Sequence, residues 1–152
     1  MKYLVVATML CAFAAPALAE GEAEPEAPAD AATEVVAGDA AKGEEDFKKC
    51  KSCHSIVAPD GTEVVKGGKT GPNLWGLDGK VVASTEGFKY GDSILAVNAT
   101  GAVWNAEELA KYVADPSEWL EETLDDDKAK SKMTFKLTKH AEDMAAYLVS
   151  IK

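Results

Sequence analysis

Residues 50–54 read CKSCH, which places two cysteines and a histidine within five positions of a 152-residue chain. Such a cluster can contribute to a zinc site, run a dithiol redox cycle or carry a covalently attached haem. A structural zinc site needs four ligands, usually as two separated pairs, and the adjacency of Cys53 and His54 suits one tetrahedral ion poorly. A dithiol motif normally lies in a βαβ unit, and its chemistry leaves His54 without a role.

Covalent haem attachment accounts for all three side chains. Cysteines three positions apart on a helical turn are separated by a rise of about 4.5 Å. This spacing suits thioether bonds to the two vinyl groups on one haem edge, and the next residue, His54, can then turn its imidazole toward the iron. The pattern favours a c-type haem over the zinc and dithiol alternatives.

The first 19 residues have the layout of a secretory signal peptide. Lys2 is followed by an apolar run from Leu4 to Leu18 and by ALA before Glu20, which predicts cleavage after Ala19. A membrane-spanning helix needs about 20 apolar residues, so we expect a cleaved leader and no stable membrane insertion. Export to the periplasm agrees with the haem interpretation, because c-type haem is attached outside the bacterial cytoplasm.

The exported part divides into an acidic tail and one small domain. Residues 20–38 contain six acidic residues, two prolines and no basic or aromatic residue, a composition that predicts disorder. Residues 39–152 contain the aromatic residues and the apolar periodicity of a folded domain, with 15 lysines against 20 acidic residues. We therefore expect one domain over 39–152, acting as a monomer and binding no nucleic acid.

The domain is predicted to be all-α with long loops. Capping residues and helix-starting residues predict five helices, which begin near Asp39, Asp92, Asn105, Pro116 and Thr138. The Pro-Asp-Gly sequence at 59–61 lies between short β-branched runs and predicts a hairpin or a loop. Connections usually span about 4 to 6 residues, so longer ones in a domain of this size need an interior partner. A buried cofactor would provide it.

The second axial position determines whether a haem iron carries electrons or binds small molecules. Met144 falls on the apolar stripe of the last predicted helix, where methionine usually fills the core. Met133 lies among lysines in KAKSKMTFKL, residues 128–137, without a helical period, and is the better candidate. Met144, His140 and a lysine remain alternatives, as does an open iron. A His/Met pair favours ferrous iron and predicts a positive potential.

Five stretches in this order resemble class I cytochromes c, particularly the bacterial cytochrome c2 or c550 type: CKSCH, KTGPNLWG, GFKYGDSI, Trp104 followed by LAKYVADP, and KSKMTFKL. The resemblance runs from residue 38 to 151 and implies the cytochrome c fold around one covalent haem c. It implies that Cys50 and Cys53 bind the haem vinyl groups. It also implies that His54 and Met133 ligate the iron.

The resemblance implies further contacts to the cofactor and its ligands: Pro72 to the His54 ring, Tyr90 and Trp104 to a buried haem propionate, and Tyr112 to the Met133 sulfur. Ser131 replaces a frequent threonine and keeps its hydroxyl, and Gly43, Phe47 and Tyr147 would form the crossing of the first and last helices. Trp104 and Tyr112 could also be ordinary core aromatics. Lys80 stands where an arginine is common near the propionates, and it lacks the planar fork of arginine.

Lysines flank both halves of the predicted haem site. In the family fold they would ring the exposed haem edge, and they are Lys48, Lys49, Lys51, Lys128, Lys130, Lys132, Lys136 and Lys139. Charges are screened over about 8 Å at physiological ionic strength, so a partner senses this local patch before the net charge of −10. We therefore expect transient, salt-sensitive docking on acidic sites of redox partners.

The leading interpretation is a periplasmic one-electron carrier that is not an enzyme. The resemblance implies electron transport from a quinol-oxidising cytochrome bc complex, or a dehydrogenase, to a terminal oxidase of a respiratory chain or a photosynthetic reaction centre. The alternative is a haem enzyme or small-ligand sensor of peroxidase or nitric-oxide type, which requires Met133 to be displaceable. A dedicated electron-entry subunit of one dehydrogenase is a third possibility.

Overall fold

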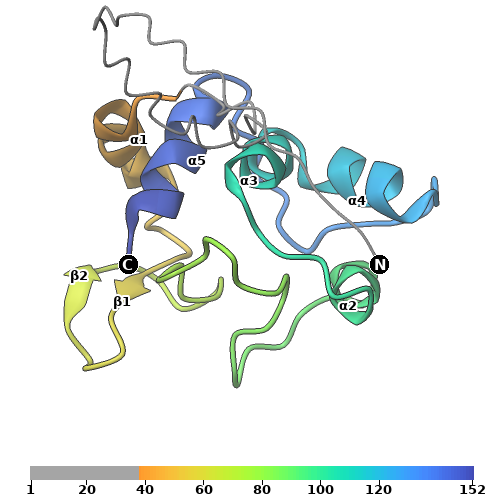
Figure 1. Ribbon diagram of the computed structural model, residues 1–152, viewed down its shortest axis with the longest axis horizontal. Coiled ribbons are helices and arrows are strands. Elements are labelled where there is room, and N and C mark those ends of the chain that lie inside the picture. The colour runs from red at the N-terminus through yellow and green to blue at the C-terminus, as the bar shows by residue number, and fades with distance from the viewer. Residues whose placement is uncertain (1–37) are drawn as a thin grey trace, which may run out of the picture. The chain divides into compact units, whose positions relative to one another are not determined.

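The computed structural model describes residues 38–152 (Figure 1). The predicted signal peptide, with its cleavage after Ala19, and the tail up to residue 37 lie outside the described residues. The elements are α1 (Ala40–Asp46), a 3-10 helix η1 (Phe47–Lys49), β1 (Ile56–Val57), β2 (Glu63–Val65), α2 (Asp92–Ala99), α3 (Ala106–Ala114), α4 (Pro116–Leu124) and α5 (Ala141–Ser150). The mostly helical chain confirms the predicted fold class, and the antiparallel pair of β1 with β2 confirms the hairpin.

Side-chain caps begin three of the helices where the sequence predicts them. Asp39, Asn105 and Asp115 each accept hydrogen bonds from backbone amides in the first turns of α1, α3 and α4 respectively. Each cap satisfies amides that have no partner inside the helix. Asp92 is the first residue of α2, as expected, although its N-cap is Gly91.

The last helix begins later than predicted, and the expected cap at Thr138 is wrong. Helix α5 begins at Ala141 after His140, whose φ of 61° lies in the left-handed region. A left-handed residue cannot continue a right-handed helix, so no helix extends back to Thr138. The predicted apolar stripe is confirmed, because Ala141, Met144, Ala145, Leu148 and Ile151 are all buried.

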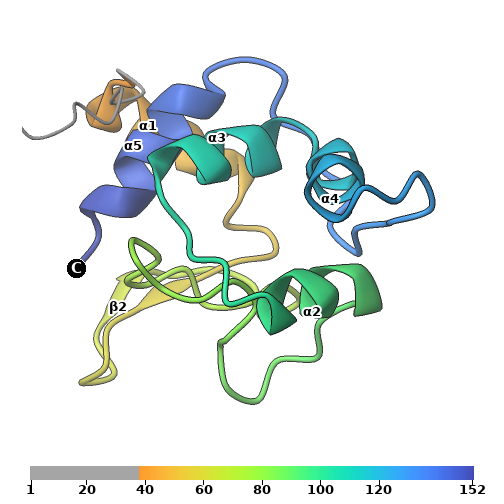
Figure 2. The same cartoon turned by 45° about the vertical axis from the view of Figure 1, so that its right-hand side comes forward.

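Helices α1 and α5 cross at Gly43, and the crossing anchors the start of the functional site. A Cβ at Gly43 would lie 2.0 Å from the Asp143 carbonyl oxygen and 2.7 Å from Tyr147 Cβ, so only glycine permits this approach. Phe47, which is 2% exposed, meets the Tyr147 ring edge-on at 5.5 Å between centroids. These are the residues that the family resemblance assigns to the crossing. Figures 1 and 2 show the two helices side by side.

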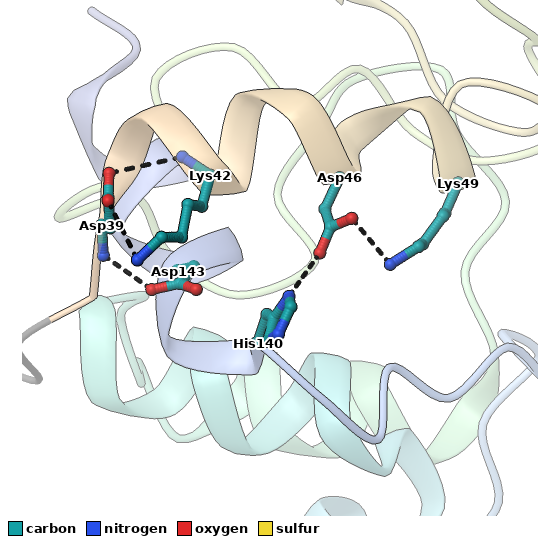
Figure 3. Close-up of polar contacts among 6 residues, drawn as sticks. All are labelled: Asp39, Lys42, Asp46, Lys49, His140 and Asp143. Atoms are coloured by element: carbon teal, nitrogen blue, oxygen red, sulfur yellow. Dashed lines mark hydrogen bonds and ion pairs between the residues drawn. The ribbon is translucent and has the colours of Figure 1, made fainter.

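Polar contacts join the same two helices at both ends of α1 (Figure 3). The Asp39 amide donates to Asp143 Oδ1 at 2.7 Å. At the other end, Asp46 accepts from Lys49 Nζ at 2.7 Å and lies 2.9 Å from His140 Nδ1. The Lys49 and His140 hydrogen bonds hold the pKa of Asp46 below its usual value. The crossing is therefore fixed by close packing inside and by hydrogen bonds at its edge.

The remaining helices extend the core from this crossing. Helix α3 packs on α5 and α4, and α4 packs on α2 (Figure 2). The rings of Trp104, Tyr112 and Trp119 lie within 5.1 to 5.3 Å of one another between centroids. Trp119 is buried, and its Nε1 donates to Glu108 Oε2 at 2.6 Å. In residues 38–152, no helix is both long enough and apolar enough to cross a membrane.

Candidate functional site

The cysteines and the histidine lie on a turn that continues directly from α1 and η1. The amides of Cys53 and His54 both donate to the Cys50 carbonyl oxygen at 3.0 Å. The Cys50 amide donates to the Phe47 carbonyl oxygen at 2.8 Å, which ties the turn to the buried Phe47. Residues 50–54 are thus held in a compact turn by the α1–α5 crossing, as the helical spacing of the two cysteines predicts.

The loop after the hairpin packs against this turn and orients the His54 ring. Pro72 offers its carbonyl oxygen to His54 Nδ1 at 2.8 Å, which is the contact that the resemblance implies. Gly71 makes the approach possible, because a Cβ there would lie 2.3 Å from His54 Cε1 and 2.6 Å from both ring nitrogens. The Gly71 amide also donates to the Cys53 carbonyl oxygen at 2.8 Å. The ring is therefore packed on one side against backbone and held in orientation by the Pro72 hydrogen bond.

The Pro72 contact also fixes the tautomer of His54. A carbonyl oxygen only accepts hydrogen bonds, so in the neutral imidazole Nδ1 carries the proton and Nε2 keeps its lone pair. Burial lowers the pKa of His54, and the Pro72 hydrogen bond opposes this only in part. A neutral imidazole with a free Nε2 is the form that ligates metals, and a backbone acceptor on the other nitrogen is the usual support for such a ligand.

The two thiols have different environments. Cys50 is half-buried, and burial raises the pKa of its thiol to about 11. Cys53 is exposed, and hydrogen bonds with Thr70 and Ser52 lower the pKa of its thiol. Because the thiolate is the nucleophilic form, Cys53 is the more readily activated of the two.

A cavity of about 420 Å³ adjoins the turn. Its volume lies in the range of about 300–1,000 Å³ that is usual for cofactor pockets. All nine sequence-predicted site residues line it: Cys50, Cys53, His54, Pro72, Tyr90, Trp104, Tyr112, Ser131 and Met133. Much of the remaining wall is aliphatic, with Leu74, Leu77, Ile94, Leu109, Val113 and Leu148. The structure thus gathers residues that lie far apart in the sequence around one apolar cavity.

The segment that carries Met133 forms part of the cavity wall. Met133 is half-buried, and its amide donates to Ser131 Oγ at 3.0 Å. Tyr112 Oη lies 3.3 Å from the same Ser131 oxygen. The resemblance places the Tyr112 hydroxyl on the Met133 sulfur, but no such hydrogen bond is present among residues 38–152, where Tyr112 meets Ser131 instead. Burial raises the pKa of Tyr112, so its hydroxyl stays protonated.

The other ligand candidates differ in position. Met144 also lines the cavity, but it is fully buried on α5 within the hydrophobic core. His140 lies outside the cavity lining, with Nδ1 2.9 Å from Asp46 Oδ2. In the part of the chain that the structure describes, no three His, Cys, Asp or Glu side chains are grouped so that they could hold a metal ion. The zinc interpretation therefore lacks a ligand set there.

The residues assigned to the propionates, Tyr90 and Trp104, both line the cavity, as does Lys80. Tyr90 Oη accepts from the Thr85 amide at 3.3 Å, and Lys80 Nζ donates to Thr85 Oγ1 at 3.2 Å. Trp104 is 6% exposed and stacks on Trp119 at 5.2 Å. Trp104 is thus both a core aromatic and a cavity residue. Its contact to a propionate, like that of Tyr90, stays a prediction.

Sequence reasoning missed Asn73, which fixes the loop behind His54 to the hairpin. Its Oδ1 accepts from the Val57 amide at 2.9 Å, and its Nδ2 donates to the Val57 carbonyl oxygen at 2.7 Å. A Gly-Pro-Asn sequence in a loop favours such side-chain to backbone bonds, so the signal was present. Asn73 therefore supports the Pro72 carbonyl that orients His54.

Lysines from near the CKSCH motif and lysines from near Met133 line the same cavity. Lys49, Lys130 and Lys132 line it, and all eight predicted lysines are exposed. Lys49 pairs with Asp46 at 2.7 Å, and Lys136 pairs with Asp115. The ammonium of Lys132 donates to the Tyr90 carbonyl oxygen at 2.9 Å.

The cavity residues fit a covalently attached haem. Two thiols three positions apart lie on one turn, and His54 offers a lone pair on Nε2. Met133 and Met144 add thioether sulfur to a wall that is otherwise largely apolar. Imidazole and thioether are ligands suited to haem iron, and an apolar wall suits the macrocycle.

Comparison with known proteins gives consistent similarities. The chain is 58% identical over 120 residues to cytochrome c2 of Rhodobacter capsulatus, covering 79% of this chain and 88% of that protein. It is 58% identical over 113 residues to cytochrome c-550 of Paracoccus versutus, covering 73% of each. The solved structure of Rhodobacter capsulatus cytochrome c2 superimposes with a TM-score of 0.73 at 60% identity, covering 74% of this chain and 97% of that chain. No family model matches the chain.

Proposed function

The chain belongs to the cytochrome c2 family of bacterial class I cytochromes c, and from this premise we propose that it is a periplasmic one-electron carrier with His54 and Met133 as axial ligands. Family members are electron carriers with one covalent haem c, and Cys50 and Cys53 are positioned as its attachment motif. The observation that carries the proposal is the Pro72 contact, which leaves Nε2 of His54 free beside a cavity that Met133 also lines.

The residues around the cavity are suited to hold one ligand set in both oxidation states. When bound, the haem supplies an iron that changes reversibly between ferric and ferrous. Cys50 and Cys53 would fix the group covalently, while Gly71 and Pro72 hold the His54 ring in orientation. A thioether sulfur favours the ferrous state, and the apolar wall excludes water, so both raise the potential. Because little in this site has to move when the oxidation state changes, the reorganisation energy of electron transfer would be small.

The cavity wall favours a carrier over the haem enzyme or sensor. Among residues 38–152, the wall contains no aspartate, no glutamate and no histidine besides His54. Peroxide chemistry needs a positioned acid or base to move protons, and lysine is a poor one at its ordinary pKa. The alternative would also require Met133 and Met144 to leave the iron open.

A redox titration of the haem-loaded protein tests this function. We expect one electron per chain, a positive potential and no turnover of hydrogen peroxide. Sustained peroxide turnover by the wild type would favour the enzyme alternative.

We place the protein in the periplasm, with residues 1–19 removed as a signal peptide and 20–38 left as an acidic tail before the domain at 39–152. The export layout of the sequence and the site of c-type haem attachment support this. Mass spectrometry of the exported protein would give the mature N-terminus, which we expect at Glu20.

We propose that the eight exposed lysines, called the lysine patch below, dock the protein on acidic partners. These are Lys48, Lys49, Lys51, Lys128, Lys130, Lys132, Lys136 and Lys139. Lys49, from near the CKSCH motif, lines the same cavity as Lys130 and Lys132, from near Met133. This supports a single positive rim around the site. The partners would be a cytochrome bc complex as donor, and a terminal oxidase or a photosynthetic reaction centre as acceptor.

Reversing one charge of the patch should slow association with such a partner. We choose Lys130→Glu, because Lys130 is exposed at the cavity and its ammonium, unlike that of Lys132, makes no hydrogen bond among residues 38–152. At low ionic strength we expect the association rate with a cytochrome bc complex to fall roughly three- to tenfold, and the difference to vanish at high salt. Stopped-flow kinetics at low and at high ionic strength measures the association rate of each variant.

The matched control is Lys66→Glu, which makes the same change in net charge at an exposed lysine outside the cavity lining. It should alter the rate much less. Equal effects of the two variants would show that net charge, and not the patch, steers the encounter.

A further inference from the structure

The segment that carries Met133 lacks the usual backbone partners. In the part of the chain that the structure describes, no backbone amide between residues 130 and 136 donates to a backbone carbonyl. The flanking residues are fixed, because the Ala129 amide donates to the Asp126 carbonyl oxygen at 3.0 Å and the Leu137 amide to the Val113 carbonyl oxygen at 2.8 Å. Backbone polar groups in folded proteins need partners, so this stretch must be held by side chains or water.

Three serine hydroxyls supply partners for three of these amides. The Lys130 amide donates to Ser93 Oγ at 3.1 Å, and the Ser131 amide donates to Ser117 Oγ at 3.3 Å. The Met133 amide donates to Ser131 Oγ at 3.0 Å within the segment. The hydroxyls of Ser93 and Ser117 therefore hold Lys130 and Ser131, which come three and two residues before Met133.

Both external hydroxyls lie on packed helices. Ser93 is in the first turn of α2 and Ser117 in the first turn of α4, and these two helices pack on each other. The first turn of α4 is itself capped by Asp115, whose carboxylate also pairs with Lys136 at the other end of the segment. The two serines thus attach the start of an irregular segment to a pair of packed helices.

We propose that Ser93 and Ser117 are positioning residues that hold the Met133 segment against the cavity. The inference rests on the proposed ligation of the iron by Met133. An external ligand can replace the methionine sulfur only when the segment moves away. Each serine hydrogen bond disfavours that open state. The apparent affinity for an external ligand is the intrinsic affinity multiplied by the fraction of molecules that are open, so a smaller open fraction means weaker binding.

The test is imidazole binding to the oxidised, haem-loaded protein. Removing one hydroxyl in Ser93→Ala or Ser117→Ala should tighten imidazole binding about fivefold, which is the usual effect of one hydrogen bond. The double variant should bind more tightly than either single one. Titration is followed by loss of the weak near-infrared band that a methionine ligand gives to ferric haem.

Two sets of controls separate positioning from general stability. Ser93→Thr and Ser117→Thr keep the hydroxyl and should restore the wild-type affinity. Ser150→Ala removes a hydrogen bond of 2.7 Å to the Tyr147 carbonyl oxygen, away from the segment, and should leave imidazole affinity unchanged. In the wild type, hydrogen exchange should be slower at the amides of Lys130 and Ser131 than at that of Thr134, which has no protein hydrogen bond among residues 38–152.

The outcomes also distinguish this inference from the proposed ligation. Unchanged imidazole affinity in both alanine variants, with the methionine band present in the wild type, would overturn the role of the serines alone. Absence of the band in the wild type would overturn the ligation by methionine and the serine inference with it.

Discussion

Met133→Ala is expected to lower the reduction potential by on the order of 0.1–0.2 V, a fraction of the roughly 0.8 V that axial ligands span. It should also let the ferrous protein bind carbon monoxide. Both effects follow if the Met133 sulfur is the second axial ligand, because its loss removes a donor that favours ferrous iron and leaves a coordination position open. Met133 is half-buried on an irregular segment, so its truncation should leave the fold intact. Redox titration and visible spectra under carbon monoxide measure the two effects.

Met144→Leu is the matched control for this variant. Met144 lines the same cavity but is fully buried in the core, and a leucine of similar volume usually costs less than about 1.5 kcal/mol there. We expect the potential and the carbon monoxide behaviour of the wild type to persist. If Met144→Leu opened the iron and Met133→Ala did not, the ligand would be Met144.

Gly43→Ala is expected to destabilise the protein by about 1–3 kcal/mol, the usual range for overpacking a close contact. The added Cβ would lie 2.0 Å from the Asp143 carbonyl oxygen, so α1 and α5 would have to separate. Helix propensity alone predicts the opposite sign, because alanine is favoured over glycine in a helix by up to about 1 kcal/mol. Denaturant unfolding of the haem-loaded protein measures the free energy of unfolding and thus decides between the two effects.

The exposed Glu45 on the same helix provides the control for Gly43→Ala. Glu45→Ala should change the free energy of unfolding by less than about 0.5 kcal/mol, as most surface substitutions do. A Gly43→Ala protein more stable than the wild type would contradict the close crossing of α1 and α5.

The parts of the site that depend on short-range pattern could be predicted from the sequence. The spacing of Cys50, Cys53 and His54 indicates the haem site, because three chemical roles must be filled by neighbouring residues. Cap chemistry located the starts of α1 and α3, since a cap is recognised by the residues that directly follow it, and Pro116 located the start of α4. The pairing of Pro72 with His54 came from family resemblance, and the structure shows the contact at 2.8 Å.

Features set by distant contacts could not be predicted in the same way. Thr138 has the chemistry of a cap, but the N-cap is His140, two residues later, whose left-handed conformation makes α5 begin at Ala141. Tyr112 hydrogen-bonds with Ser131, a contact that the family pattern did not indicate, and its contact to the Met133 sulfur stays a prediction. The hydroxyls of Ser93 and Ser117 meet the Met133 segment from two other helices. No local pattern identifies such contacts.

The most direct test of ligation by His54 and Met133 is the visible and near-infrared spectrum of the purified wild type in both oxidation states, with and without carbon monoxide. We predict a low-spin ferric spectrum with the weak methionine-to-iron band in the near infrared, and a ferrous spectrum that carbon monoxide does not change. A high-spin ferric spectrum, or ready binding of carbon monoxide by the ferrous protein, would contradict the proposed electron carrier and favour an open haem iron.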